Sequence, residues 1–418
     1  MEEKIGMTKL WALFLVVFVL LRNAQAAADG NKSRGGMRRL AGAPGVPVPM
    51  TLLTSAVAMG AVCLDGTPPA YHMDPGSGAG KNRWIIHLQG GSWCESVGSC
   101  LYRKASSLGS SNLMNKQIYF GGILSSSPLD NPDFYSWNQV VIRYCDGASF
   151  AGEGYDAGSG LFFRGQRIWN AAIQHLLAMG MSSADQVLLT GSSAGALAVV
   201  LHCDQFGAVF AGRGTTVKCL ADAGFFLDAV NVAGWHTLRY YFGGVVATHG
   251  VAQNLPRSCT SHLDATSCFF PQNVIGGINT PIFVLNAAYD TWQIRESLAP
   301  DGADPGRAWR ACKSSRLACN AFQMNFLQGM QAYTYTWINL ATYKTNDDSN
   351  SEYQSIPMSA AFRDQMVGTV LGVSRSRRNG FFINSCFTHD QSEYLATWNA
   401  YGSPSIQNKA IWKSVGDW

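Results

Sequence analysis

Short runs of apolar residues recur along the chain and predict buried strands. Five runs are continuous rather than alternating: Trp84 to Leu88, Val140 to Tyr144, Val187 to Thr190, Pro281 to Leu285 and Phe381 to Asn384. Continuous apolar runs are typical of parallel strands, because both faces of such a sheet are covered. The pattern therefore predicts a mostly parallel sheet that is buried on both sides.

Helical patterns lie between some of these strands. Residues Arg167 to Met179 place apolar side chains at helical spacing, and Gly180 follows as a helix end signal. The small apolar run from Ala194 to Leu201 suits a helix that packs closely on the sheet. Strands that alternate with helices predict a doubly wound α/β fold.

Two stretches interrupt this alternation. Residues at about 227–278 are irregular, and residues at about 299–378 are mixed, with a helical pattern near Ala321 to Gln331. We expect both to be insertions that form a cap over the carboxyl edge of the sheet. Because the strand that carries Phe381 returns after them, the sequence predicts a single domain over residues 48–418.

The N-terminus has the layout of a secretory signal peptide. Two lysines precede an apolar run from Leu10 to Leu21, and Ala24-Gln25-Ala26 then supplies a cleavage site. The alternative is a membrane anchor, but the run is about 12 residues and a span needs about 20. We expect a signal peptide over residues 1–26 and, from its Gly, Arg and Pro content, a flexible linker over residues 27–47.

Composition narrows the class of protein. Charged residues make up 14% of the chain and the net charge is +4, with no long basic run in the body, so binding of nucleic acid has little support. No later stretch is long and apolar enough for a membrane span. The sequence predicts a monomer, with no membrane partner.

Eleven cysteines fit an oxidising, extracellular compartment. No CxxC pair occurs, so we expect neither a structural zinc site nor any other metal or cofactor. The pairs that lie close in sequence are Cys94 and Cys100, Cys203 and Cys219, and Cys312 and Cys319. Spacing leaves the connectivity open, and the odd number leaves at least one thiol without an intrachain partner.

A nucleophile motif stands between a predicted strand and a predicted helix. Gly191-Ser192-Ser193-Ala194-Gly195 matches G-x-S-x-G, and the strand–turn–helix context is the one that a nucleophile elbow requires. Glycines are needed there because the turn is too tight for side chains. Ser193 is therefore the predicted nucleophile, and Ser192, which has no glycine two residues before it, is the weaker candidate.

A serine nucleophile needs a base and a carboxylate, which follow it in the order acid, then histidine, in the α/β-hydrolase fold. His389 lies in a polar turn after the last apolar strand, and Asp290 ends NAAYD just after the strand PIFVL. We predict them as base and acid. The histidines that lack a preceding strand are His236, His249 and His262, and the alternative acids are Asp222 and Asp228.

The loop after the strand WIIHL supplies candidate donors for the oxyanion of an acyl transfer. His87 to Trp93 reads HLQGGSW and is similar to the HGGG-type loop of esterases. Its glycines let backbone amides approach a substrate carbonyl. The predicted donors are the amides of Gly91, Ser92 and Ala194.

With these residues in place, the chain resembles the plant pectin acetylesterase family, which is related to Notum, an animal carboxylesterase that removes a fatty acyl group from a signalling protein. The likeness covers about residues 50–418. It rests on AVCLDGTPPAYH from Ala61, IIHLQGGSWC from Ile85, NPDFYSWNQVVIRYCDGASFAG from Asn131, LFFRGQRIW from Leu161, LLTGSSAGALA from Leu188, NAAYDTWQI from Asn286 and FFINSCFTH from Phe381.

The resemblance implies an extracellular enzyme of the cell wall that hydrolyses acetyl esters of pectin, with the triad Ser193, Asp290 and His389. It also implies an oxyanion loop at Gly90 to Trp93 and substrate contacts from residues near the cleft. The substrate contacts expected in this way are Trp93, Arg143 and Asp146.

The chain departs from the family pattern at several positions near the predicted site. Ser192 and Asp390 stand where the family usually has Cys, Ala196 where it has Gly, and Gln89 where it has Glu. The family's Cys-rich tail is also missing, which makes Cys386 the expected unpaired cysteine.

Two other functions remain open at this stage. One is an esterase with a different substrate, either a Notum-like deacylase for long acyl chains or an enzyme for another acetylated polysaccharide. The other is a secreted carbohydrate-binding protein that has lost catalysis. The complete set of three catalytic residues argues against the latter.

Overall fold

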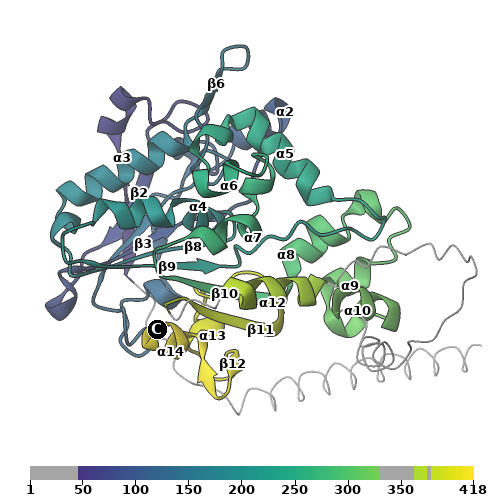
Figure 1. Cartoon of the computed structure of the whole chain (residues 1–418). Helices are drawn as coiled ribbons and strands as arrows, with labels where there is room; N and C mark the ends of the chain where they lie inside the picture. The colour runs from purple at the N-terminus through teal and green to yellow at the C-terminus, as the bar shows by residue number, and fades with distance from the viewer. Residues whose placement is uncertain (1–45, 329–361, 374–377) are drawn as a thin grey trace, which may run out of the picture. The chain divides into compact units, whose positions relative to one another are not determined.

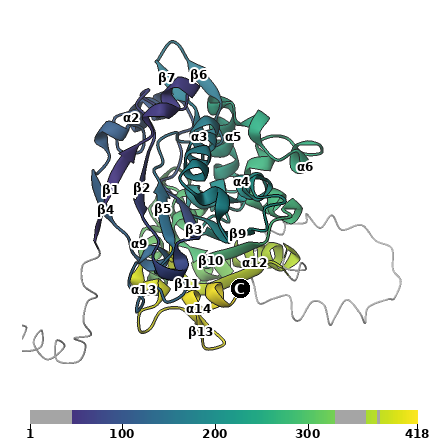
Figure 2. The same ribbon diagram turned by 90° about the vertical axis from the view of Figure 1, so that its left-hand side faces the viewer.

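A nine-stranded mixed sheet forms the centre of the protein in a computed structural model, which describes residues 46–328, 362–373 and 378–418 (Figures 1 and 2). The strand order is β11-β10-β9-β8-β3-β5-β2-β1-β4. The six parallel strands are β3 (Arg83–Leu88), β5 (Asn138–Ile142), β8 (Gln186–Ser192), β9 (Thr216–Asp222), β10 (Ile282–Asp290) and β11 (Gly380–Thr388).

Three antiparallel strands extend one edge of this sheet. They are β2 (Ala70–Asp74), β1 (Pro47–Leu52) and β4 (Gln117–Tyr119). Two small hairpins lie outside the main sheet: β6 (Gly154–Asp156) with β7 (Leu161–Phe163), and β12 (Ser405–Ile406) with β13 (Lys409–Ala410).

Successive residues of the parallel strands face two different cores. In β3, Trp84 and Ile86 belong to the larger core, and Ile85 belongs to the smaller one. Side chains alternate in this way along any strand, so a strand that is buried on both faces must be apolar throughout. This explains why the continuous apolar runs marked the strands.

Helices and turns cover both faces of the sheet. The α-helices are α2 (Val97–Lys104), α3 (Gly165–Ala178), α4 (Ala194–Val209), α5 (Thr237–His249), α6 (Arg257–Thr260), α7 (Pro271–Val274), α8 (Thr291–Gln293), α9 (Arg310–Ser314), α10 (Ala321–Gln328), α12 (Phe362–Val373), α13 (Leu395–Trp398) and α14 (Ile411–Asp417). Side chains of α3 and α4 fill the larger core, and those of α13 and α14 fill the smaller one on the opposite face (Figure 1).

Short turns of 3-10 and π-helix connect these elements. They are η1 (Thr54–Met59), η2 (Gly78–Gly80), η3 (Ser111–Leu113), η4 (Gly122–Leu124), η5 (Met181–Ser183), η6 (Val251–Asn254), η7 (Ser267–Phe269), η8 (Ile275–Gly277), η9 (Ile294–Leu298), η10 (Asp301–Ala303) and η11 (Arg316–Ala318).

The topology confirms the predicted α/β fold of the hydrolase type. From β3 the chain moves to one neighbour, β5, and then crosses to the other neighbour, β8. A reversal of this kind opens a crevice beyond the carboxyl ends of the strands, which is where open α/β sheets bind ligands. The loop after β3 and the turn after β8 both lie at that edge.

Element boundaries follow the predictions with local differences. The predicted strand Val140 to Tyr144 lies two residues earlier, since β5 spans Asn138–Ile142, and the helix predicted over Arg167 to Met179 begins two residues earlier as α3. The helical pattern near Ala321 to Gln331 is α10 as far as Gln328, and residues 329–361 lie outside the described part of the chain, as does the predicted signal peptide.

Five disulfides and one thiol account for all eleven cysteines. The bridges are Cys63–Cys145, Cys94–Cys100, Cys203–Cys219, Cys259–Cys268 and Cys312–Cys319. Cys386 is free, as expected from the family comparison. Within the described ranges, no helix has both the length and the apolar character that crossing a bilayer would require.

Candidate active site

Ser193 lies in a strained turn between β8 and α4. Its backbone has φ 55° and ψ −123°, a conformation that costs a non-glycine residue about 1–3 kcal/mol and is concentrated at functional sites. A Cβ on Gly195 would lie 2.0 Å from the Leu88 carbonyl oxygen, and one on Gly191 would lie 2.5 Å from the Gly195 carbonyl oxygen. Both glycines are therefore required by the close approach of β3, β8 and α4.

A continuous chain of hydrogen bonds joins three residues from different strand ends. His389 Nε2 lies 2.8 Å from Ser193 Oγ, and His389 Nδ1 lies 2.7 Å from Asp290 Oδ2. Asp290 is the last residue of β10, and its register partner in β11 is Thr388, the residue before His389. The parallel pairing of these two strands thus delivers the acid and the base to the same point.

Asp290 is held in place by a second contact. Its side chain is fully buried, and its other oxygen, Oδ1, accepts a hydrogen bond of 2.9 Å from the Gln293 amide at the start of α8. Oδ2 is thereby aimed at His389. A carboxylate in this position fixes the imidazole tautomer that leaves Nε2 free to accept a proton from Ser193.

Electrostatics around His389 favour its charged form. Burial alone would lower the pKa of His389, but the neighbouring carboxylates of Asp290, Asp390 and Asp222 outweigh burial and raise this pKa to about 9. Stabilisation of an imidazolium is what a base needs once it has taken the proton of the nucleophile. The same field therefore opposes loss of a proton from the His389 imidazolium.

The loop after β3 approaches Ser193 closely. A Cβ on Gly90 would lie 2.5 Å from the Ser192 carbonyl oxygen and 3.0 Å from Ser193 Cβ. Gly91 and Ser92 both have positive φ, at 143° and 54°. The turn therefore depends on glycine at two positions, and it brings main-chain amides beside the nucleophile.

Arg103 orients the peptide bond between Gly91 and Ser92. Its Nη1 donates a hydrogen bond of 2.8 Å to the Gly91 carbonyl oxygen, and the guanidinium stacks on Tyr144 at 4.7 Å. In a trans peptide the following N–H points away from the carbonyl. Arg103 thus directs the Ser92 amide to the opposite side, and no acceptor within the described residues contacts that amide. Ala194 begins α4, so its amide has no partner within the helix.

An aromatic wall borders His389 and the predicted oxyanion loop. Trp93 packs edge-on against Phe226 and Trp292, with ring centroids 4.9 and 5.5 Å apart, and Phe226 lies 6.3 Å from the His389 ring. Trp292 Nε1 donates to Ser92 Oγ at 3.1 Å. Trp93 itself donates at 2.7 Å to Ser149 Oγ. These rings thus form an apolar surface on one side of His389.

Comparison with known proteins agrees with this geometry. The pectinacetylesterase family matches residues 42–349 and 340–418. The chain belongs to the pectinacetylesterase family. It is 44% identical to pectin acetylesterase 11 of Arabidopsis thaliana over 373 residues, which is 89% of this chain and 87% of that protein. It is 39% identical to pectin acetylesterase 5 of the same plant over 97% of this chain and 87% of that protein.

A more distant likeness links the chain to animal enzymes. It is 30% identical to the palmitoleoyl-protein carboxylesterase notum1a of Danio rerio, over 56% of this chain and 49% of that protein. The relation to Notum expected from the sequence is thus present, at about half the length of the animal protein.

Several residues that differ from the usual pattern of the pectinacetylesterase family lie around the turn at Ser193. Gln89 Oε1 accepts hydrogen bonds from Arg143 Nε at 2.8 Å and from the Tyr144 amide at 3.0 Å, which ties the oxyanion loop to β5. Ser192 donates to Glu393. Ala196 packs against Gly224. A Cβ placed on Gly224 would lie only 2.4 Å from the Ala196 Cβ.

Asp390 introduces a carboxylate beside the base. Its Oδ1 lies 3.5 Å from His389 Nε2, the nitrogen that also contacts Ser193. This oxygen is buried and has no hydrogen-bond partner within the described part of the protein. Burial raises the pKa of Asp390 to about 7, although the charge of His389 acts in the opposite direction.

The alternative acids hold other parts of the fold. Asp222 Oδ2 accepts hydrogen bonds from the amides of Gln391 and Ser392 at 2.9 and 2.6 Å, so it supports the loop that carries the base. Burial raises the pKa of Asp222 to about 6. Asp228 forms ion pairs with His236 and Arg239.

The other candidate histidines also lie in structural contacts or at the surface. His249 Nε2 is 2.8 Å from the Cys94 carbonyl oxygen and close to the sulfurs of Cys94 and Cys100. Three residues of these types can hold a metal, but here the two sulfurs are bonded to each other and supply no thiolate. The His262 side chain is exposed, and its Nδ1 lies 3.3 Å from Oγ of its neighbour Ser261.

All three predicted substrate contacts, Trp93, Arg143 and Asp146, are buried inside the fold. Arg143 lies between Gln89 and His72, with Nη1 3.1 Å from His72 Nε2. Asp146 accepts hydrogen bonds of 3.0 Å from the amides of Ala148 and Phe150, and burial raises its pKa to about 6. These contacts favour a role in shaping the loops behind the oxyanion site, and a contact with substrate stays a prediction.

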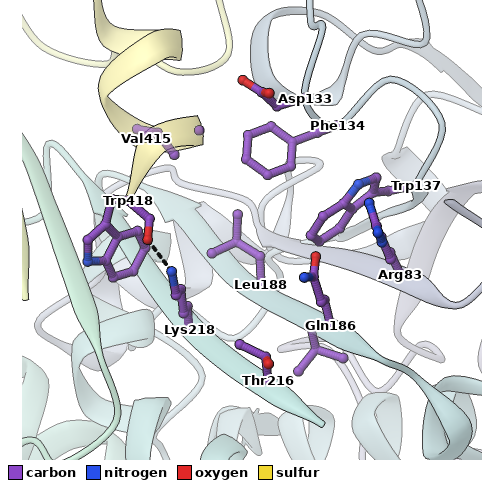
Figure 3. Close-up of a pocket in the computed structure, with 12 residues that line it drawn as sticks. Arg83, Asp133, Phe134, Trp137, Gln186, Leu188, Thr216, Lys218, Val415 and Trp418 are labelled. Carbon is purple, nitrogen blue, oxygen red and sulfur yellow. Dashed lines mark hydrogen bonds between the residues drawn. The ribbon is translucent and has the colours of Figure 1, made fainter. Parts of the chain in front are cut away.

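A separate cavity of about 260 Å³ lies at the opposite edge of the sheet (Figure 3). It opens beside the amino ends of β3, β8 and β9, near Arg83, Gln186 and Thr216. Ser193 stands at the carboxyl end of β8, so the strand separates this cavity from the triad. No serine or histidine lines it, and we do not assign it a part in ester hydrolysis.

Proposed function

We propose that this protein removes acetyl groups from pectin, that is, from acetylated galacturonan. The observation that carries the proposal is the hydrogen-bond chain from Ser193 Oγ to His389 and on to Asp290, with distances of 2.8 and 2.7 Å. The substrate class comes from the pectin acetylesterases that the chain resembles over most of its length.

The first half of the reaction forms an acetyl-enzyme. His389 Nε2 takes the proton of Ser193 Oγ, which attacks the acetyl carbonyl carbon. The amides of Gly91, Ser92 and Ala194 stabilise the oxyanion that develops. When the tetrahedral intermediate collapses, His389 gives its proton to the sugar oxygen, and the free hydroxyl leaves.

The second half restores the enzyme. His389 takes a proton from water, whose oxygen attacks the acetyl group on Ser193. Collapse of the second intermediate releases acetate and returns the proton to Ser193 Oγ. Asp290 stays ionised throughout and stabilises the imidazolium in both halves.

Packing beside the nucleophile favours a short acyl group. Phe226 is fully buried, and its ring meets those of Trp93 and Trp292 edge-on at 4.9 and 5.3 Å. A long acyl chain, as in a Notum-like deacylase, would need these rings to move apart. Comparing hydrolysis of acetyl and octanoyl esters of one alcohol tests this choice, and faster octanoyl hydrolysis would support the deacylase.

The same proposal covers location and assembly. A signal peptide over residues 1–26 would send the protein out of the cell to the wall, where the five disulfides would be stable. A flexible linker over residues 27–47 would precede one esterase domain over residues 48–418, with insertions at about 227–278 and 299–378. Contacts group Val46–Trp418 into one compact unit, which supports a single domain. We expect this domain to act as a monomer.

Acetate release from acetylated polysaccharides is the decisive experiment. We expect release from acetylated galacturonan, less from acetylated xylan, and none from the Ser193→Ala protein. A fluorophosphonate probe should label the parent protein and not the variant. Full activity in the Ser193→Ala protein would refute the mechanism. If the parent protein neither releases acetate nor is labelled by the probe, the result would favour a carbohydrate-binding protein without catalysis.

A further inference from the structure

An open pocket lies where the segment that follows β9 meets the segment that follows β10. One segment, residues 223–236, leaves β9 and passes His389 at Phe226, and the other, residues 291–303, follows Asp290. The Val232 amide donates a hydrogen bond of 2.8 Å to the Leu298 carbonyl oxygen and joins them. The pocket measures about 660 Å³ and includes Trp235, His236, Arg239, Tyr240, Pro300 and Ala303 among its lining.

A network centred on Asn231 fixes the rim of this pocket. Asn231 is buried, and its Oδ1 accepts hydrogen bonds from the amides of Ala233 and Trp235 at 2.8 and 3.0 Å. Its Nδ2 donates to Thr237 Oγ1 at 2.7 Å, and its amide donates to the Trp235 carbonyl oxygen at 2.7 Å. Trp235 therefore stands on a turn that is already ordered, which lowers the entropy cost of binding.

Two large aromatic side chains in this pocket face solvent. Trp235 is 72% exposed and Tyr240 is 87% exposed. A single exposed aromatic residue is common at a protein surface, but two that line one pocket mark a surface for a ligand. Their rings offer flat apolar faces, and the indole N–H and phenol O–H offer polar edges.

Polar groups on the same helix complement the aromatic faces. Arg239 and His236 both line the pocket, and each is partly exposed while it contacts Asp228. Arg239 Nε donates to Asp228 Oδ2 at 2.6 Å, its Nη2 pairs with the same oxygen, and its Nη1 donates to Ser267 Oγ at 3.0 Å, so the guanidinium is held at the pocket wall. An arginine that is fixed in this way presents its remaining N–H groups to a carboxylate.

We propose that this pocket is a subsite for uronate units of the polysaccharide, beyond the unit whose ester reacts at Ser193. Trp235 and Tyr240 stack against the C–H faces of the pyranose rings, and Arg239 binds a uronate carboxylate. The inference rests on the proposed pectin substrate. It follows from continuity, since the walls of the pocket continue from β9 and β10, which lie in the sheet between β8 and β11, the strands that lead to Ser193 and His389.

The test compares a polymer with a small ester. Trp235→Ala and Tyr240→Ala, each in the full chain, should raise the KM for acetylated galacturonan roughly fivefold to tenfold relative to the KM for an aryl acetate. Tyr119→Ala is the matched control, because Tyr119 is 67% exposed on β4 at the far edge of the sheet, and it should change neither value. A polymer KM that stays at the parent value, or equal changes for both esters, would overturn the subsite.

A binding measurement separates the subsite from the proposed function. In the Ser193→Ala background, galacturonan in an affinity gel should retard the protein, and Trp235→Ala should abolish the retardation. If the parent releases no acetate from galacturonan but retardation depends on Trp235, the proposed function fails and the subsite stands. If the gel does not retard the protein, the subsite fails. It also fails if size-exclusion chromatography shows that the Ser193→Ala protein is a dimer and that Trp235→Ala converts it to a monomer, because Trp235 would then lie in an interface between two copies.

Discussion

Replacing Asp390 with asparagine changes the charge beside the base and little else. Asp390 Oδ1 and Ser193 Oγ both lie near His389 Nε2, at 3.5 and 2.8 Å. The ionised side chain of Asp390 therefore stabilises the imidazolium and offers Nε2–H an acceptor other than Ser193. In Asp390→Asn, the amide keeps the shape and removes the charge.

The size of the effect follows from the distance and from the surrounding charges. An opposite charge within a few ångströms shifts a pKa by about 1–3 units. We expect a shift of about one unit from Asp390, because its distance of 3.5 Å is longer than that of a short hydrogen bond and its side chain is 24% exposed to solvent. His389 also faces Asp290 from β10 and Asp222 from β9, and Glu393 lies in its own loop, paired with His87 of β3. Those groups remain, so the pKa of His389 falls only in part.

The pH profile of kcat/KM measures this shift. His389 must be neutral to act as base, and its pKa is raised to about 9, so activity rises with pH up to that value. Loss of the Asp390 charge should move the acidic limb down by about one pH unit, which raises kcat/KM at neutral pH by up to about tenfold. The assay is hydrolysis of a small aryl acetate over the range from about 7 to about 9 in which both groups titrate.

A control variant makes the result decisive. Asp364→Asn removes a half-exposed carboxylate that pairs with Arg363 on α12, and it should leave the profile unchanged. If Asp390→Asn leaves the acidic limb in place, Asp390 does not tune His389. A limb that moves to higher pH would refute the reasoning outright.

Three further predictions follow from the same site. Asp290→Asn should lower kcat about 10⁴-fold in the aryl acetate assay while the protein still melts cooperatively, because the imidazole loses its fixed tautomer; a loss below tenfold would point to another acid. Arg103→Ala should lower kcat about 10²-fold with little change in KM, since the Ser92 amide loses its orientation, and an effect confined to KM would contradict this. The pKa of His389 is about 9 in the folded protein and 6.5 for the free side chain, so charged His389 stabilises the fold fully below pH 6.5. That contribution is lost as the pH rises through about 9. The melting temperature of His389→Ala should therefore fall less between these two pH values than the melting temperature of the parent.

The central strands could be predicted because their burial on both faces leaves a local signature. The edge strands could not be predicted in this way. β1 begins at Pro47 and exposes most of its side chains, β2 contains His72 and Asp74, and β4 has only three residues, so none of them forms a continuous apolar run. β9 was missed because Thr216 and Lys218 interrupt its apolar pattern near the amino end, where the strand reaches the surface.

The choice of acid shows what strand order adds. Asp222 and Asp290 both end parallel strands, so position in the sequence makes each a candidate. β11 pairs with β10 and not with β9, so the residue after Thr388 meets Asp290. A sequence does not reveal which strands are neighbours. It also does not reveal that the α2 helix folds back on the loop after β3, so the role of Arg103 at Gly91, twelve residues before it, could not be predicted.

The loop that carries His389 is itself fixed by the two strands beside the elbow. Asp222 of β9 accepts the amides of Gln391 and Ser392, and its own carbonyl oxygen accepts the Ser193 amide at 2.9 Å. Glu393 contacts Ser192 of β8, and although burial raises the pKa of Glu393, His87 and Ser192 together lower it to about 2. Glu393 is thus ionised, and Asp390, whose pKa burial raises to about 7, also carries its charge in the pH range in which His389 titrates. The base is held by a buried acidic network, and this explains how a second carboxylate can sit beside His389 without displacing it from Ser193.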